Sequence, residues 1–402
     1  MTERVIFHID VNSAFLSWEA VYGMKERGDI VDLREVPSII GGDEATRHGI
    51  VLAASMPAKR LGIRTAETIR EALVKCPNLI IKPPMRPLYE KYSKAFVKEA
   101  LEYSNVYEQF SIDEIFLDMT GKIELGKTPV ETAYKLKDQI QNKLGFTVNI
   151  GISSNKLLAK MASDFEKPNR VHTLFLDEIR EKMWPLKVGD LFSVGKSTGK
   201  KLEVLGIHTI GDLAQMDLKL LQSHIGKKHG RRIHQFANGI DDSKVESRGD
   251  INKGYGHSIT LSRDISNENE AGVVLLSLVE KVAARLRRDQ VKGDCVVVEL
   301  RDKDFHRYTH QRKLDVPTDI TDEIMKTARE LFLECYKGTP VRLLGVRVTG
   351  ISKEEYSQMG LFDNEKKEKL RKLDASLDRI RQRYGNDSIQ RGSIFLQSGK
   401  EE

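Results

Sequence analysis

Two apolar runs in this chain end in, or are interrupted by, acidic residues. The first, Val5–Ile9, has the composition of a strand and leads directly into Asp10. The second, Tyr107–Asp118, is interrupted by the adjacent pair Asp113 and Glu114. Carboxylates in such places are expensive to bury unless a positive partner neutralises them. A lone acid at a strand end is usually a solvated turn residue, but two such places in one unit weaken that interpretation.

A pair of divalent cations would supply the missing positive charge. If Asp10, Asp113 and Glu114 meet at one end of a sheet, their oxygens suit Mg²⁺. We expect Asp10 and Asp113 to bridge two ions about 3.5–4 Å apart, an arrangement that clamps the attacking and leaving oxygens of an in-line displacement. Glu114 would bind the ion that activates the attacking hydroxyl, and the backbone carbonyl of Val11 would complete one shell. The pattern thus predicts phosphoryl or nucleotidyl transfer.

Hydrophobic periodicity predicts an α/β unit over about the first 175 residues. The pattern favours helices at Ser13–Met24, Tyr89–Tyr103 and Pro129–Leu144, and strands at Asp32–Val36, Ile50–Ala54 and Phe146–Ile152. Pro83, Pro84 and Pro87 interrupt this pattern and mark a boundary. We therefore expect one catalytic unit that carries an inserted subdomain at about residues 13–84.

The rest of the chain changes character twice. Residues 176–240 read as short helices punctuated by glycine, and a polar link over 241–250 leads to a third unit. In that unit the pattern predicts strands at 253–261, 294–301, 306–316 and 341–349, with helices at 273–288 and 321–336. Their order is β-α-β-β-α-β, the split βαβ arrangement. A charged tail follows from about residue 351, with one amphipathic helix whose shared face comprises Leu370, Leu373, Leu377 and Ile380.

Composition limits the classes of protein that fit. A chain of 402 residues is too long for one ordinary core and predicts two to four domains. The net charge is a modest +6, so any nucleic-acid footprint must come from local clustering. Three distant cysteines fit neither a disulfide framework nor a zinc site. Because the sequence shows no signal peptide and no membrane-spanning stretch, we expect a cytoplasmic protein with no membrane partner.

A nucleotide triphosphate would need basic residues near the acids. The candidates are Lys59, Arg60 and Arg64, which lie close together in the chain, and Lys167, which precedes Pro168. Pro168 favours an extended backbone at Lys167, which would project its side chain from a loop. Each residue taken alone is more often an ordinary surface charge.

The glycine-punctuated region resembles a helix-hairpin-helix over residues 191–213. In that motif a glycine hairpin directs backbone N–H groups at a DNA phosphate, helped by the N-terminus of the next helix. The candidate contacts are Gly195, Gly199, Lys196, Lys200 and Lys201. The alternative interpretation is a helical linker domain.

Two further features are candidates for binding. Cations such as Arg342 and Arg347 recur along the strands of the third unit, either as a solvated face or as a row that tracks a phosphate backbone. The apolar segment Gln358–Phe362 interrupts the polar tail. Such a segment often packs on its own domain, but its place after the last domain favours docking into the groove of another protein.

Four motifs make the chain similar to the Y-family (translesion) DNA polymerases of the DinB/UmuC, DNA polymerase IV-like kind. They are Asp10–Phe15, Ser111–Glu114, Gly151–Lys156 and Ala159–Asn169, and they occur in the family's order. The resemblance implies a multidomain α/β (α+β) fold shaped like a right hand. It places a palm at 1–12 and 85–175, small fingers at 13–84, a helical thumb at 176–240, a linker at 241–250, a β-α-β-β-α-β little finger at 251–350 and a tail with a sliding-clamp motif at 351–402.

The resemblance also implies roles for single residues. It makes Asp10 and Asp113 metal ligands and Glu114 the metal-binding catalytic carboxylate. Phe15 falls at the steric-gate position, where an aromatic ring crowds a ribose 2′-OH. Lys167 matches a lysine that contacts the triphosphate.

The fingers depart from the family pattern at two positions. Met56 stands where a tyrosine usually contacts phosphate, and Lys59 where an arginine is common. A lysine supplies charge but not the bidentate fork of an arginine. In the tail, Gln358, Leu361 and Phe362 match the clamp motif.

The implied activity is template-directed addition of dNMP to a primer 3′-OH by two Mg²⁺ ions, with low fidelity and lesion bypass in DNA damage tolerance. The expected partners are primer-template DNA, dNTP and a sliding clamp, and the expected state is a monomer. Two alternatives stay open. One is a non-catalytic DNA-repair scaffold that binds primed DNA and the clamp, and the other is a nucleotide cyclase.

Overall fold

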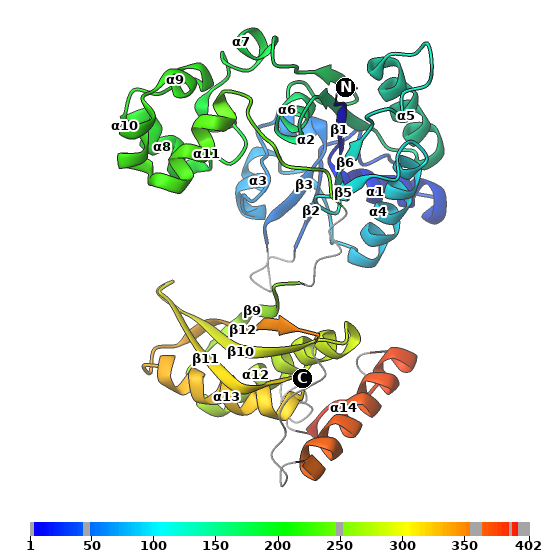
Figure 1. Cartoon of the computed structure of the whole chain (residues 1–402). Coiled ribbons are helices and arrows are strands. Elements are labelled where there is room, and N and C mark those ends of the chain that lie inside the picture. Colours follow the sequence, from blue (N-terminus) through cyan, green and yellow to red (C-terminus); the bar gives the residue numbers. More distant parts are fainter. Residues whose placement is uncertain (1–3, 43–48, 247–251, 354–363, 386–387, 393–402) are drawn as a thin grey trace. The chain divides into compact units, whose positions relative to one another are not determined.

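The computed structural model describes residues 4–42, 49–246, 252–353, 364–385 and 388–392. The chain forms two compact units (Figure 1). Of the described residues, 4–42 and 49–246 belong to one unit, and 252–353, 364–385 and 388–392 belong to the other. In the described part of the chain, no helix is both long enough and apolar enough to cross a membrane.

A five-stranded sheet forms the centre of the first unit, with the order β5-β6-β1-β7-β8. Its strands are β1 (Ile6–Val11), β5 (Tyr107–Gln109), β6 (Glu114–Asp118), β7 (Val148–Ser153) and β8 (Val171–Thr173). The central strand β1 is buried throughout and pairs antiparallel with both β6 and β7. In the β1–β6 register Asp10 lies opposite Glu114, so two of the predicted acids are cross-strand neighbours.

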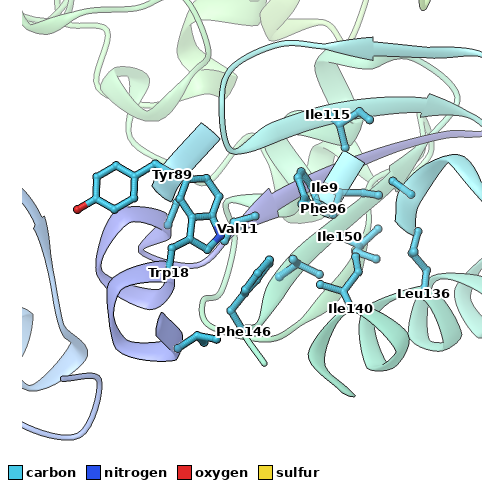
Figure 2. Packing of buried hydrophobic residues seen from close by; sticks show 14 of the residues in the cluster. Ile9, Val11, Trp18, Tyr89, Phe96, Ile115, Leu136, Ile140, Phe146 and Ile150 are labelled. Carbon is cyan, nitrogen blue, oxygen red and sulfur yellow. The ribbon is translucent and has the colours of Figure 1, made fainter. Parts of the chain in front are cut away.

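Helices pack on both faces of this sheet, so the side chains of β1 are buried on one face or the other. They are α1 (Ala14–Tyr22), α4 (Arg86–Leu101), α5 (Pro129–Leu144) and α6 (Lys156–Ser163). Because side chains alternate along a strand, Ile9 and Val11 enter the main core, where Figure 2 shows them near Trp18 of α1 and Phe146. The other face, which includes Asp10, is directed towards α6.

The inserted segment carries a small sheet with the order β3-β2-β4. Its elements are β2 (Ser38–Gly41), β3 (Val51–Ala54), α2 (Met56–Arg60), α3 (Ile69–Lys75) and β4 (Ile80–Lys82). The prediction of a strand at Asp32–Val36 is wrong, because these residues form turns. Asp32 accepts the backbone N–H of Arg34 at 2.9 Å and also pairs with its guanidinium, and such local bonding competes with a strand.

Residues 176–240 form a helical bundle whose apolar core is shared with α6. Its helices are α7 (Ile179–Lys182), α8 (Lys196–Val204), α9 (Ile210–Gln215), α10 (Leu218–Ile225) and α11 (Lys227–Ala237). Gly230 is buried where α10 and α11 meet, and a Cβ there would lie 3.2 Å from the Cα of Gln222. Only glycine therefore permits this close approach without a shift of one helix.

The second unit confirms the predicted β-α-β-β-α-β order. Its elements are β9 (Gly254–Ile265), α12 (Glu268–Arg288), β10 (Lys292–Asp302), β11 (Arg307–Thr318), α13 (Thr321–Cys335) and β12 (Val341–Ser352). The antiparallel sheet has the order β11-β10-β12-β9, so β12 separates the two strands that α12 connects. Figure 1 shows α12 and α13 on one face of this sheet.

A last helix, α14 (Asn364–Tyr384), packs beside α12 through charged residues. Arg287 of α12 binds Asp374 and Asp378 of α14 at 3.1 and 2.6 Å. The predicted apolar face is docked only in part, because Leu370 and Leu377 are half-buried whereas Leu373 and Ile380 remain 49% and 36% exposed. The tail beyond residue 351 therefore includes a helix held to the second unit by ion pairs.

Candidate active site

The three predicted acids come together at one end of the five-stranded sheet. Asp10 is the penultimate residue of β1, and Glu114 begins β6 directly opposite it. Asp113 stands one residue earlier, and its carbonyl accepts the backbone N–H of Val11 at 3.0 Å. The pairing of β1 with β6 is therefore enough to bring the acids together.

The electrostatics of Asp10 show how crowded this negative charge is. The side chain is nearly enclosed, with the whole residue only 7% exposed. Burial raises the pKa of Asp10 to about 6, and Glu114 and Asp113 push it in the same direction while Lys167 opposes them. A divalent cation would relieve this repulsion, and an all-oxygen donor set suits Mg²⁺. The residues present therefore fit the ions that the sequence predicts.

Two lysines neutralise part of this charge. Lys167 contacts the Asp10 carboxylate and forms a second ion pair with Asp164 at 2.7 Å. Burial works against the charge of Lys167, but Asp10 and Asp164 outweigh it and raise its pKa. Lys160 of α6 binds Glu114 at 2.6 Å. The sequence predicted Lys167 as a functional residue but did not single out Lys160.

Asn12 holds the loop that carries Lys167 against the sheet. Its Oδ1 accepts hydrogen bonds from the backbone N–H of Asn169 and the hydroxyl of Thr147, both at 2.9 Å. Its Nδ2 donates to Oδ1 of Asn149 at 3.1 Å. Sequence reasoning missed this role, and an amide at the end of a buried strand was the only signal for it.

A pocket of about 560 Å³ adjoins Asp10 and is rich in cations. Lys59 and Arg60 of α2 line it together with Lys167, as a triphosphate site requires. Arg34, which sequence reasoning missed, lines the same pocket and is fixed by Asp32 and the carbonyl of Gly145. The other sequence candidate, Arg64, is exposed and lies outside this lining. Met56, the departure from the family pattern, also lines the pocket.

A second cavity of about 240 Å³ lies beside Phe15, with Asp10, Asp113 and Lys59 in its lining. The Phe15 ring stacks on Tyr89 of α4, with centroids 4.6 Å apart and planes 10° from parallel. Lys59 donates to Oγ of Ser13 at 2.8 Å, and burial and then Lys167 lower its pKa. The predicted gate residue is thus rigidly backed and faces the same cavity as two of the acids.

In the helical bundle the candidate DNA contacts lie at the start of α8. Gly195 precedes α8 without a side-chain cap, and Lys200 is exposed one turn into the helix. Gly199 is buried in α8, and the nearest atom to a Cβ there would be the Cα of Gly189 at 3.9 Å, which is an ordinary contact. Sequence reasoning missed a second basic group on α11, comprising the exposed residues Lys227, Lys228, Arg231 and Arg232.

In the second unit the two predicted arginines differ in setting. Arg347 is exposed between buried Val346 and Val348, on the sheet face away from the core. Arg342 lies over the ring of Phe305 at 4.9 Å.

The predicted clamp-binding residues Gln358, Leu361 and Phe362 lie outside the described residues.

Among the described residues, one set of three metal-type side chains has all its ligand atoms within 4.8 Å of one another, and it comprises Asp302, Asp304 and His306. Asp302 accepts the backbone N–H groups of Asp304 and His306, each at 2.9 Å. These bonds explain the cluster as the turn between β10 and β11. Asp10, Asp113 and Glu114 do not meet this distance criterion, and Lys160 and Lys167 contact two of them.

Comparisons with known proteins agree with this arrangement. The profile of the impB/mucB/samB family matches residues 9–164, and the profile of its C-terminal domain matches 252–361. A profile described as the DNA polymerase-iota thumb domain matches 189–241. The chain is 43% identical over 394 residues to DNA polymerase IV of Clostridium acetobutylicum, with 98% of both chains covered. It is 37% identical over 404 residues to DNA polymerase IV of Acetivibrio thermocellus, with 99% of both covered.

A solved structure gives the fold. A Y-family DNA polymerase chimera aligns with 87% of this chain and all of its own, with a TM-score of 0.75 and 23% identity. That likeness defines the fold class as a right-hand polymerase. By the sequence matches, the chain belongs to the impB/mucB/samB family, the DinB type of Y-family polymerase, and is therefore a DNA-directed DNA polymerase.

Proposed function

We propose that this protein adds dNMP to a primer 3′-OH by a two-Mg²⁺ mechanism and that it bypasses lesions at low fidelity. The observation that carries the proposal is the placing of Asp10, Asp113 and Glu114 beside a pocket lined by Lys59 and Lys167. Acids that can hold cations and lysines that can hold phosphates are the two parts that nucleotidyl transfer needs.

Each group has a distinct part in this proposal. Asp10, Asp113, Glu114 and the Val11 carbonyl would hold the ions, which when bound lower the pKa of the attacking hydroxyl and offset the charge on the leaving pyrophosphate. Lys59, Arg60 and Lys167 bind and orient the triphosphate in the adjoining pocket. Phe15 closes the cavity next to Asp10 and excludes a ribose 2′-OH.

We also keep the other binding assignments as proposals. The N-terminus of α8, with Gly195, Gly199 and Lys200, and the second-unit residues Arg342 and Arg347 would contact the backbone of primer-template DNA. A sliding clamp would bind Gln358, Leu361 and Phe362 of a monomeric, cytoplasmic enzyme. Replacing Leu361 and Phe362 with Ala should remove stimulation by the clamp and leave basal extension unchanged.

The decisive experiment is primer extension with Mg²⁺ and dNTPs by the wild type and by Asp113→Ala. We expect extension by the wild type only, with duplex binding retained by both proteins because Asp113 is not one of the proposed contacts to the DNA backbone. A non-catalytic scaffold would bind the duplex and extend it with neither protein. Substantial extension by Asp113→Ala would refute the assignment of this carboxylate as a metal ligand.

A further inference from the structure

Lys160 is the most enclosed cation beside the candidate metal ligands. It lies on α6, is 9% exposed, and donates to Oε1 of Glu114 at 2.6 Å. A carboxylate has a second oxygen that can accept another ligand. Lys160 can therefore hold Glu114 in one orientation while the carboxylate still binds a cation.

Two aromatic rings enclose the ammonium group of Lys160. Phe110, which precedes the Asp113–Glu114 pair, has its ring centroid 5.2 Å from Nζ, and Phe192 has its centroid at 5.7 Å. The two rings contact each other edge to face at 6.1 Å. Cation–π attraction of this kind is strongest where the cation is removed from water. The two rings therefore restrict where the ammonium group can lie.

Phe192 belongs to the helical bundle rather than to the sheet that carries the acids. Its backbone N–H donates to Sδ of Met161 on α6, and its ring stacks on Phe236 of α11 at 6.3 Å. It stands three residues before Gly195, which begins the candidate phosphate-binding helix α8. Phe192 therefore connects the helical bundle, which is proposed to bind DNA, with Lys160, the lysine that binds Glu114.

We propose that Lys160 is a positioning residue that orients Glu114, and that Phe192 couples this orientation to the seating of the helical bundle on the sheet. The inference rests on the proposed function. Lys160 also competes with a bound cation electrostatically, because its charge lies directly on one of the proposed ligands. Its removal should therefore tighten cation binding and slow nucleotide addition, whereas a general loss of structure would weaken both.

Lys156 provides a matched control one helical turn earlier on α6. It binds Glu108 of β5 at 2.5 Å and lies over the Phe116 ring at 5.1 Å. Its burial resembles that of Lys160, with side chains 13% and 11% exposed. The two lysines thus make the same kind of contact, but only Lys160 makes it with a proposed metal ligand.

The experiment compares wild type, Lys160→Met and Lys156→Met by two readouts. Titration of each protein alone with Mn²⁺, followed by the electron paramagnetic resonance of the free ion, gives cation affinity without turnover. Single-nucleotide addition at saturating dNTP gives the rate. For Lys160→Met we expect cation binding about threefold to tenfold tighter and addition about tenfold or more slower, with the KM for dNTP nearly unchanged.

For Lys156→Met both readouts should stay within about twofold of the wild type, although removing one partner of the buried pair with Glu108 lowers stability. Weaker Mn²⁺ binding or an unchanged rate in Lys160→Met would overturn the proposal. An inactive wild type would instead refute the proposed function, and the Mn²⁺ titration would still decide whether Lys160 holds Glu114.

Phe192→Leu tests the coupling with both charges in place, so it does not depend on the folding of Lys160→Met. Because the variant keeps an apolar contact and loses only the ring, Mn²⁺ affinity should be unchanged and addition should slow about threefold or more. Phe165→Leu is the control, because Phe165 packs on the same apolar cluster. Equal rates for the two variants would remove Phe192 from the proposal.

Discussion

The amide oxygen of Asn12 accepts the backbone N–H of Asn169 at 2.9 Å across 157 residues of chain. This bond joins the end of β1 to the loop that carries Lys167, and Asn12 is nearly buried where it forms. Asn12→Ala would leave the part-buried N–H of Asn169 without its acceptor, which costs up to about 3 kcal/mol. Some of that cost should appear as displacement of Lys167 from the pocket.

We therefore expect Asn12→Ala to raise the KM for dNTP more than it lowers kcat, together with a lower melting temperature. Asn12→Asp keeps the oxygen that accepts from Asn169 but loses the Nδ2 donor to Asn149 and adds a negative charge, so it separates loss of the acceptor from loss of the other contacts. Steady-state kinetics of both variants at saturating DNA measure the effect. If Asn12→Ala lowers kcat alone and leaves KM unchanged, Asn12 does not act through Lys167.

The stacking of Phe15 on Tyr89 makes the proposed gate rigid. Phe15→Ala should increase ribonucleotide incorporation relative to deoxynucleotide incorporation about tenfold or more, because a cavity beside Asp10 would then accept a 2′-OH. A tenfold change corresponds to about 1.4 kcal/mol of lost discrimination. Phe15→Tyr keeps the ring and should keep the selectivity. Competition between rNTP and dNTP on one primer measures the ratio, and an unchanged ratio would exclude Phe15 as the gate.

Features encoded by neighbouring residues were predictable from the sequence. The predicted helix Pro129–Leu144 has the observed bounds because its signals are local, with proline in its first turn and a capping box formed by Thr128 and Glu131. The β-α-β-β-α-β order of the second unit followed from periodicity in the same way. Asp10 and Glu114 were each recognisable as acids beside apolar strands, but their meeting was only a condition of the prediction and depends on the pairing of β1 with β6.

Features that depend on distant side chains were not predictable. Lys160 reaches Glu114 across 46 residues, and nothing in its own segment distinguishes it from Lys156. Arg34 was not predicted because the composition of residues 32–36 is typical of a strand. In the structure its contact with Asp32 belongs to a turn. On α14 the periodicity marked a leucine face that docks only in part, and ion pairs with Arg287 also hold the helix. Charge complementarity of this kind leaves no periodic signal.

Burial of His8 predicts a loss of stability in mild acid. Its Nδ1 bonds Oγ of Ser163, which itself donates to the carbonyl of Lys160, so Nδ1 carries the proton. Burial lowers the pKa of His8 well below its usual value, and Lys160 and Lys167 lower it further. The unfolded chain then takes up a proton near pH 6.5 that the folded chain does not, so stability falls as the pH falls below that value.

From pH 7 to pH 5 this uptake should cost about 2 kcal/mol of unfolding free energy. His8→Asn keeps a donor to Ser163 and should lose this part of the pH dependence, whatever its stability at pH 7. Urea unfolding in chelator, followed by tryptophan fluorescence, measures it in the first unit, which holds both tryptophans, Trp18 and Trp184. Asp10 titrates in the same pH range in both proteins. The difference between their pH profiles of stability therefore reports on His8 alone. Parallel pH profiles would contradict the prediction.

Arg287 should determine whether α14 stays docked on α12. Its side chain is 12% exposed and binds Asp374 and Asp378, whereas the side chain of Arg288, the next residue, is 71% exposed and pairs with Asp289. Removing one partner from a buried ion pair costs about 3–5 kcal/mol because the other charges stay buried. A pair as exposed as that of Arg288 contributes about 0–1 kcal/mol.

Hydrogen exchange of the α14 amides distinguishes the two arginines. In Arg287→Met, protection of these amides should fall about a hundredfold or more, while amides in β10 and β12 keep theirs, because the helix opens locally without unfolding the sheet. Arg288→Met should leave α14 protected. The proposed clamp motif lies between β12, which ends at Ser352, and α14, which begins at Asn364. Undocking of α14 would therefore release one end of the segment that carries the motif. Arg287→Met should then alter clamp stimulation without altering basal extension, and equal exchange in both variants would show that Arg287 does not hold the helix.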